Sequence, residues 1–253
     1  MISKTHLPVL LIAASLLSAV GWAQPARLAP SCSNATLQGA YGFLITGTNT
    51  GNPIAIVGQI LADGKGGLTG TETVSDNGGT FETTPVTGTY SIGSKCAGTA
   101  AITPKGGTAA NYNLTVLPGK KVQLVSADSG TVQSGLLQAQ GGSCSLTGVS
   151  GAYGIQQTGE VVGQGPLVFG GEIVLHANGL ISGIRWGSVN GVISSGESIS
   201  GAYKVDKTCY GGAMVSISNG ALTFYNLQVV RGEHAVLFLP TEPGTVASGS
   251  WER

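Results

Sequence analysis

Charged side chains are scarce in this 253-residue chain, where Asp, Glu, Lys and Arg together make up only 9% of the residues. Twelve basic residues balance twelve acidic ones, and loss of Lys4 with a leader would leave eleven basic against twelve acidic. Binding to nucleic acid or to an anionic membrane surface requires a concentration of positive charge. We therefore expect no nucleic-acid partner.

Long apolar runs are also lacking. The longest, residues 7–19, is shorter than the ~20 residues that span a bilayer, which argues against a membrane anchor. Gly21 and Ala23 follow it as small residues at the two positions that a signal peptidase reads. We therefore predict a signal peptide over residues 1–23 and a loose tail over residues 24–31. No later stretch is apolar enough to cross a membrane, so no integral membrane segment is expected after cleavage.

The residues of catalytic and metal sites are few. A mature chain would keep two histidines, His176 and His234, and contains no Gly-x-Ser-x-Gly nucleophile motif. No Cys-x-x-Cys pair occurs, and no histidine lies near a cysteine in the sequence. Residues 63–66, Asp-Gly-Lys-Gly, resemble part of a calcium loop but lack the further acidic ligands, so we interpret them as a turn. We expect no metal, no cofactor and no catalytic residue.

What the chain does contain is an internal repeat. Residues 32–43, beginning Cys-Ser and ending Gly-Ala-Tyr-Gly-Phe, return at residues 144–155 as Cys-Ser and Gly-Ala-Tyr-Gly-Ile. The correspondence continues at an offset of about 113 to the end of both copies, a period that indicates tandem domains rather than a solenoid. We predict two domains, residues 32–140 and 144–253. The linker of residues 141–143 is short, so the two domains should touch or nearly touch.

Each copy carries two cysteines, Cys32 and Cys96 in the first and Cys144 and Cys209 in the second. An exported chain meets oxidising conditions, which makes disulfides the default. Three pairings are possible on paper, and the duplication favours one bond within each copy, worth roughly 4 kcal/mol in the chain-entropy model. A secreted or periplasmic location follows, with lipoprotein cleavage at Cys32 as an alternative.

Short runs of alternating apolar and polar residues are separated by turn signals such as Asn77-Gly78 and Asn190-Gly191. Each copy has eight such runs, and no stretch has a helical period. Consecutive hairpins favour an all-β fold of two tandem eight-stranded antiparallel up-and-down barrels, with two β-sandwiches as the alternative. Pro85 interrupts one run, and we expect a sheet edge or a bulge there.

The residues that the two copies share are those of turns, packing and crosslinks, whereas charged residues do not match. Glu72, for example, aligns with Arg185, and Lys121 with His234. No pair of carboxylates recurs that could divide acid and base work. The shared tyrosines could line a small-ligand pocket inside each barrel, or they could be ordinary core with each hydroxyl bonded to the backbone. They are Tyr41, Tyr90, Tyr112, Tyr153, Tyr203 and Tyr225.

Residues 37–43, Leu-Gln-Gly-Ala-Tyr-Gly-Phe, and 62–70, Ala-Asp-Gly-Lys-Gly-Gly-Leu-Thr-Gly, resemble a class of secreted, functionally unassigned, glycine-rich bacterial proteins of the Acidobacteria type. The resemblance implies export and a barrel of lipocalin- or avidin-like architecture, and it assigns no catalytic residue. The glycine-x-tryptophan opening of true lipocalins is absent.

These observations favour a secreted, non-enzymatic protein that binds a small apolar ligand or a partner through its barrels. One alternative is an enzyme, cyclase- or isomerase-like, that acts on a barrel-bound substrate in one copy. Another is a purely structural extracellular component. The ligand, the partner and the oligomeric state are left open by the sequence.

Overall fold

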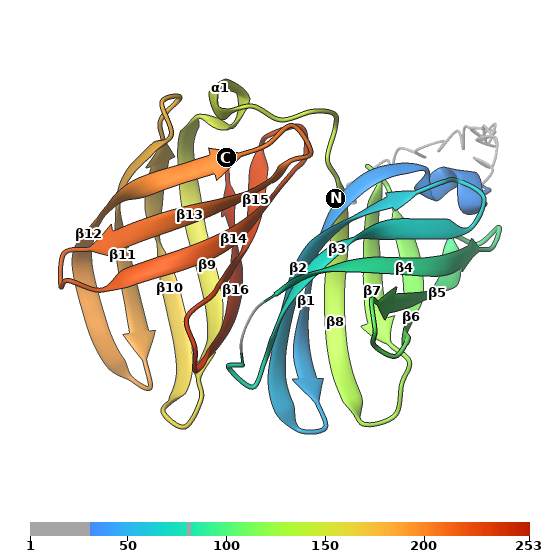
Figure 1. Ribbon diagram of the computed structural model, residues 1–253, viewed down its shortest axis with the longest axis horizontal. Coiled ribbons are helices and arrows are strands. Elements are labelled where there is room, and N and C mark those ends of the chain that lie inside the picture. The colour runs from blue at the N-terminus through green and yellow to red at the C-terminus, as the bar shows by residue number, and fades with distance from the viewer. Residues whose placement is uncertain (1–30, 80–81) are drawn as a thin grey trace, which may run out of the picture. The chain divides into compact units, whose positions relative to one another are not determined.

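The computed structural model describes residues 31–79 and 82–253, and Ser31–Arg253 form one compact unit. The expected signal peptide, residues 1–23, and all but the last residue of the expected tail lie outside the described residues. The described chain is almost entirely β-structure and closes into two antiparallel eight-stranded barrels in tandem (Figure 1). The predicted fold is confirmed, and the sandwich alternative is wrong.

In the first barrel every strand pairs with the next one along the chain, and the last closes on the first. Its strands are β1 (Gly39–Asn49), β2 (Asn52–Ala62), β3 (Gly67–Asp76), β4 (Thr83–Ile92), β5 (Ala97–Pro104), β6 (Ala110–Leu117), β7 (Lys121–Ser126) and β8 (Thr131–Ala139).

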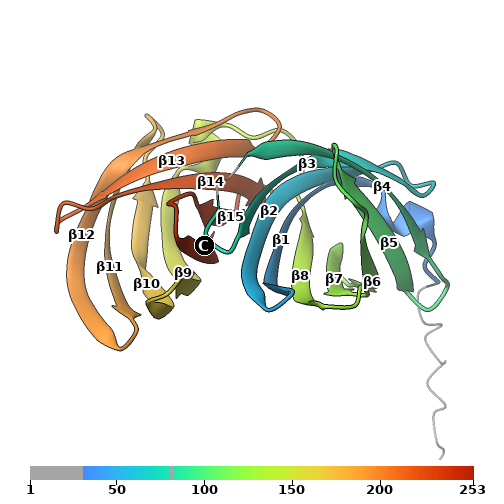
Figure 2. The same ribbon diagram turned by 60° about the horizontal axis from the view of Figure 1, so that its bottom comes forward.

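The second barrel repeats this order, and β16 closes on β9. Its strands are β9 (Gly151–Val161), β10 (Gly165–Leu175), β11 (Leu180–Val189), β12 (Val192–Val205), β13 (Tyr210–Ile217), β14 (Leu222–Val230), β15 (Ala235–Pro240) and β16 (Thr245–Glu252). Within each barrel the strands curve around a common interior (Figure 2).

Alternation along the strands decides which side chains fill the barrels. In β6, Tyr112 and Leu114 are buried while Asn111 and Asn113 are exposed, as expected for a strand with one face to the core and one to solvent. The inward residues of the first barrel form one continuous apolar cluster, and those of the second barrel form another. Burial of these faces, with no sheet edge left unpaired, is what favours closure.

A short helix covers one end of each barrel, which the sequence analysis did not predict. The 3₁₀ helix η1 (Asn34–Leu37) begins the first copy, and α1 (Leu146–Val149) begins the second (Figure 1). In the first copy, Asn34 Nδ2 donates to the Lys65 carbonyl at 3.1 Å, and Asn34 Oδ1 accepts from the Ile92 amide at 2.7 Å. One side chain therefore fastens the helix both to the turn between β2 and β3 and to the end of β4.

Disulfides fasten the same ends, in the predicted pairing Cys32–Cys96 and Cys144–Cys209. Each joins the start of its copy to the turn after the fourth strand of its barrel. Cys96 and Cys209 both have positive φ, at 61° and 68°, so the two copies share an uncommon backbone conformation at this crosslink.

The expected contact between the barrels is present, and it produces a third apolar cluster. Strand β15 is buried at all six positions because Val236 and Phe238 face the barrel interior while Leu237 and Leu239 face the first barrel. A Cβ on Gly42 would lie only 2.4 Å from Val230 Cγ1, so this glycine permits the close approach of β1 to β14. The cluster comprises Ala55, Val57, Val230, Ala235, Leu237, Leu239 and Val246.

The bulge or edge expected at Pro85 is wrong. Residues 83–89 of β4 pair with β3 in unbroken register through Pro85, and barrel closure leaves β4 between two neighbours. Pro85 stands where the pairing of β4 with β5 begins, one residue before Val86. A register shift is instead found in the second barrel, between Arg185 and Gly187.

Candidate functional site

All six shared tyrosines lie in the barrel cores, each exposing 8% or less of its surface. The hydroxyls of four of them donate to oxygens within the same barrel. Tyr90 donates to the Asn34 carbonyl at 2.9 Å, and Tyr203 to the His176 carbonyl at 2.9 Å. Tyr153 donates to the Val149 carbonyl, and Tyr112 to Gln133 Oε1 at 3.2 Å. These hydrogen bonds fasten the tyrosines to the short helices, to a turn and to a strand of their own barrels. This is the structural role that the sequence allowed for them.

The interior of the second barrel is filled. Tyr225, Phe238 and Trp251 form an aromatic cluster in which ring centroids are 5.2 to 6.1 Å apart. The remaining cavity beside Tyr225 and Trp251 measures about 20 Å³. The second barrel therefore has little free interior space beside this aromatic cluster.

An ion pair lies at the same cavity. Arg185 Nε is 2.9 Å from Glu197 Oε2, and both side chains expose only 13% of their surface. The Arg185 guanidinium lies 4.2 Å from the centroid of the Phe169 ring, and Asn219 Nδ2 donates to Glu197 Oε1 at 2.9 Å. The Arg185 charge is thus compensated by a carboxylate and an aromatic face, and the Glu197 carboxylate accepts a further hydrogen bond from an amide.

In the first barrel the equivalent position holds Glu72. Glu72 pairs in register with Gly58 and Thr84, just as Arg185 pairs with Gly171 and Glu197. It is 8% exposed, and burial raises its pKa to about 7. The Glu72 carboxylate has no hydrogen bond or ion pair among the described residues.

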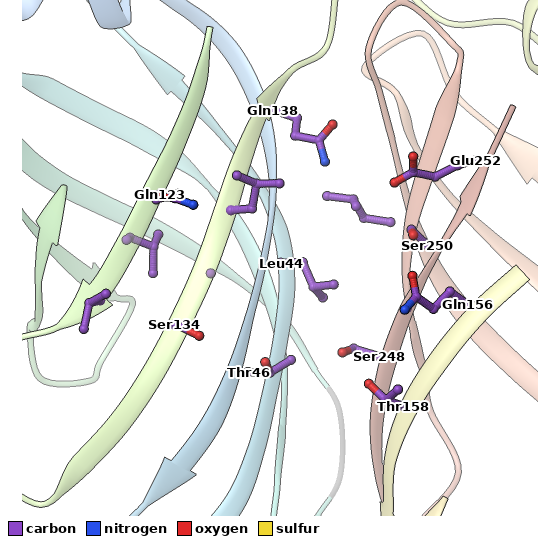
Figure 3. Close-up of a pocket in the computed structure, with 16 residues that line it drawn as sticks. Leu44, Thr46, Gln123, Ser134, Gln138, Gln156, Thr158, Ser248, Ser250 and Glu252 are labelled. Atoms are coloured by element: carbon purple, nitrogen blue, oxygen red, sulfur yellow. The ribbon is translucent and has the colours of Figure 1, made fainter. Parts of the chain in front are cut away.

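Both barrels also build a cleft between their outer walls, with a volume of about 540 Å³. Its first wall is formed by β1, β7 and β8, and its second by β9, β15 and β16. Figure 3 shows the labelled side chains of the two walls on either side of the cleft. The lining residues are Leu44, Thr46, Gln123, Leu124, Val125, Ser134, Gly135, Leu136, Gln138, Gln156, Thr158, Leu237, Ser248, Gly249, Ser250 and Glu252.

Neutral hydrogen-bonding groups dominate the cleft. Glu252 is the one charged lining residue, and its carboxylate is 3.0 Å from the Arg231 guanidinium. The other polar lining side chains are amides and hydroxyls. Gln138 is 4% exposed, and its Oε1 has no hydrogen-bond partner among the residues described. The cleft can therefore form several hydrogen bonds with a ligand, with little contribution from charge–charge interactions.

The remaining sequence candidates lie apart. His176 Nε2 is 2.9 Å from Ser182 Oγ on the outside of the second barrel, with no carboxylate bonded to that ring in the described part of the chain. Asp63 Oδ1 accepts from the amides of Lys65, Gly66 and Gly67, which lowers the pKa of Asp63 and confirms the predicted turn. Over residues 31–79 and 82–253, no cluster of three or more His, Cys, Asp or Glu side chains could hold a metal ion, and no helix is long and apolar enough to cross a membrane.

The cleft was not predicted from the sequence. Nor were the positions of Glu72 and Arg185 predicted to be functional sites. The aligned copies showed that the two charges differ, but only the register shows that both point into a barrel. The continuous apolar run of β15 was the available signal for a second buried face. A comparison with protein families found no matching family model, and a search of curated proteins found no match.

Proposed function

We propose that this chain is an exported, non-enzymatic binding protein that holds a neutral, hydroxyl-rich ligand of the saccharide class in the cleft between its barrels. The observation that carries the proposal is the chemistry of the two walls. Polar side chains from both barrels face one space of about 540 Å³, and all but the ion-paired Glu252 are neutral. Cavities of 300–1,000 Å³ are typical of small-ligand sites.

A ligand of this class matches the walls in two respects. Hydroxyl and amide groups both donate and accept, so a ligand with many hydroxyls can satisfy them in several orientations. Leu44, Leu136 and Leu237 provide apolar surface for the C–H groups of such a ligand. A purely apolar ligand would cover the amides and hydroxyls without pairing them, which costs roughly 1–3 kcal/mol for each buried group.

Export supports the same assignment. Both disulfides form within their own copies, and such bonds persist in oxidising compartments. With the interior of the second barrel filled, its walls rather than its core offer the contact surface.

The test is a titration of the folded chain with neutral gluco- and N-acetylglucosamine oligosaccharides, followed by NMR or calorimetry. Thr158→Leu on β9 should weaken binding about tenfold or more, equivalent to roughly 1.4 kcal/mol. Ser200→Leu is the matched control, because Ser200 is exposed on β12 and does not line the cleft. Absence of saturable binding, or equal loss in both variants, would contradict the proposal, as would tight binding of apolar ligands at the cleft.

A further inference from the structure

Register places opposite charges at one interior position of the two barrels. Arg185 in β11 faces Glu197 in β12, whereas Glu72 in β3 faces Thr84 in β4. The second barrel thus carries a compensated charge pair, and the first carries a carboxyl group opposite a neutral hydroxyl. The duplication makes the two positions equivalent. They differ in that the charge of Arg185 is paired within its barrel, whereas Glu72 has no oppositely charged partner there and would need one from outside the chain.

Among the described residues, no cation forms an ion pair with Glu72. Both Glu72 and Tyr112 are buried in the first barrel, and burial first and the Glu72 carboxylate second raise the pKa of Tyr112 to about 12. Tyr112 donates its proton to Gln133 Oε1 at 3.2 Å, so its hydroxyl oxygen still has lone pairs to offer. Around them the interior of the first barrel is an apolar cluster that includes Ile56 and Val86.

The Glu72 carboxylate remains reachable. The completely enclosed polar atoms that lack a hydrogen bond in the described chain are Tyr41 Oη, Gln138 Oε1 and Gln228 Oε1. The oxygens of Glu72 are not among them although they too have no partner, so they keep some contact with the outside. A small group can therefore meet the carboxylate without unfolding the barrel.

We propose that the interior end of the first barrel around Glu72 binds a primary alkylammonium group, which supplies the positive charge that Arg185 supplies in the second barrel. The ammonium N–H groups donate to Glu72 and to the Tyr112 oxygen, and the alkyl chain lies against the aliphatic wall. A guanidinium suits this site less well, because Ile56 replaces the aromatic face that Phe169 offers to Arg185.

A metal ion fits these groups poorly. Calcium and magnesium take six or more oxygen ligands, commonly from several carboxylates. Within the described residues Glu72 belongs to no group of three or more acidic, histidine or cysteine side chains. An organic cation needs fewer ligands and gains from the apolar surroundings, so it is the better match.

Binding should depend on pH in a defined direction. Protonation of Glu72 competes with the ammonium group, so affinity should rise about tenfold per pH unit below the Glu72 pKa and level off above it. Tyr112 is a titratable group whose pKa is raised by the Glu72 charge, and the Asp128 carboxylate raises the Tyr112 pKa as well. Tyr112 stays protonated throughout this range because its pKa is raised to about 12.

The experiment is a calorimetric and NMR titration of the disulfide-bonded chain with n-butylammonium chloride at about pH 6 and about pH 8, on either side of the Glu72 pKa. We expect saturable binding that is at least about tenfold tighter at the higher pH and that is lost in Glu72→Gln. Glu172→Gln is the matched control, since Glu172 is exposed on the outer wall of β10. Tetramethylammonium, which has no N–H group, should bind more weakly.

A second variant keeps the result interpretable if Glu72→Gln disturbs folding. Thr84→Arg places a guanidinium opposite Glu72, in the mirror arrangement of Arg185 and Glu197, and it should abolish butylammonium binding while raising the melting temperature. Unchanged binding in Thr84→Arg or in Glu72→Gln, no binding at either pH, or equal binding of tetramethylammonium or calcium would overturn the proposal. The cleft variant Thr158→Leu should bind butylammonium normally, which separates this proposal from the saccharide site.

Discussion

At the scale of single residues, Glu72 links proton binding to the stability of the first barrel. Its pKa is about 7 in the folded chain, against an ordinary value of 4.5. Between these values the folded state binds more protons than the unfolded state, so stability falls as pH rises. The contribution of the protonated carboxyl is complete below pH 4.5 and is lost as pH passes through 7.

We predict that Glu72→Gln removes this slope. The difference between the two pKa values corresponds to about 3 kcal/mol, so the variant should exceed the wild type in unfolding free energy by up to that amount at about pH 8. At about pH 4 the two should be equal. Urea unfolding at a series of pH values measures both. Parallel curves for the two proteins would show that Glu72 does not carry the effect.

Arg185 and Glu197 differ from Glu72 in that their buried charges are paired with each other. Breaking a buried pair by removing one partner typically costs about 3–5 kcal/mol, because the other charge is left unpaired. We predict a loss of about 3 kcal/mol for Arg185→Met, and a smaller loss for the double variant Arg185→Met with Glu197→Leu. Denaturant unfolding of both variants decides this, and equal losses would contradict the role given to the pair.

At the scale of elements, the short helix at one end of each barrel, η1 or α1, is held by a disulfide as well as by hydrogen bonds. Each disulfide closes a loop with a sequence separation of 64 or 65 residues. The chain-entropy model gives about 4 kcal/mol for a loop of this length. Replacing Cys32 and Cys96 together by Ala should lower the unfolding free energy by about that amount, while the Cys144–Cys209 bond in the other copy remains intact.

Thermal and urea unfolding under non-reducing conditions checks this prediction, with the double replacement of Cys144 and Cys209 as the counterpart. Hydrogen exchange should locate the loosening at η1 and the Cys96 turn. Loss of protection in the second barrel instead would show that the crosslink acts beyond its own copy.

The strands and helices also show which features could be predicted from the sequence alone. The eight strands of each copy were predicted, because turn signals such as Asn77-Gly78 and Asn190-Gly191 separate runs of alternating apolar and polar residues. The helices η1 and α1 were missed because four residues are too short to reveal a helical period. Pro85 was misjudged because a closed barrel places that strand between two neighbours, and a local rule does not contain that information.

At the scale of the whole molecule, the two copies meet through different faces. The first barrel contributes the outer face of β2, with Ala55 and Val57, and the second contributes that of β15, with Leu237 and Leu239. Hydrogen bonds add to this contact, including Ser75 Oγ to the Thr245 carbonyl at 3.1 Å and Asn226 Nδ2 to Thr73 Oγ1 at 3.2 Å. The sequence repeat predicts equivalent barrels, and it does not say which faces come together, so the cleft beside this contact could not be predicted.

Because the contact joins unlike faces, each barrel has a counterpart, outside this apolar contact, of the face that the other one buries. Leu239 in β15 is fully buried, whereas its register equivalent in β7, Val125, is 55% exposed. The two positions therefore form a matched pair in which the place in the barrel is equivalent and the environment differs.

Truncation at these positions measures what the contact contributes. Leu239→Ala should cost about 2–5 kcal/mol, because it removes buried methyl groups and leaves a cavity between the barrels. Val125→Ala should change stability by no more than about 0.5 kcal/mol, since it lies on an exposed face. If urea unfolding shows equal effects, the barrels do not depend on this contact in solution. A large loss for Leu239→Ala alone would mean that the β2–β15 contact holds both barrels, and with them the two walls of the cleft, in one cooperative unit.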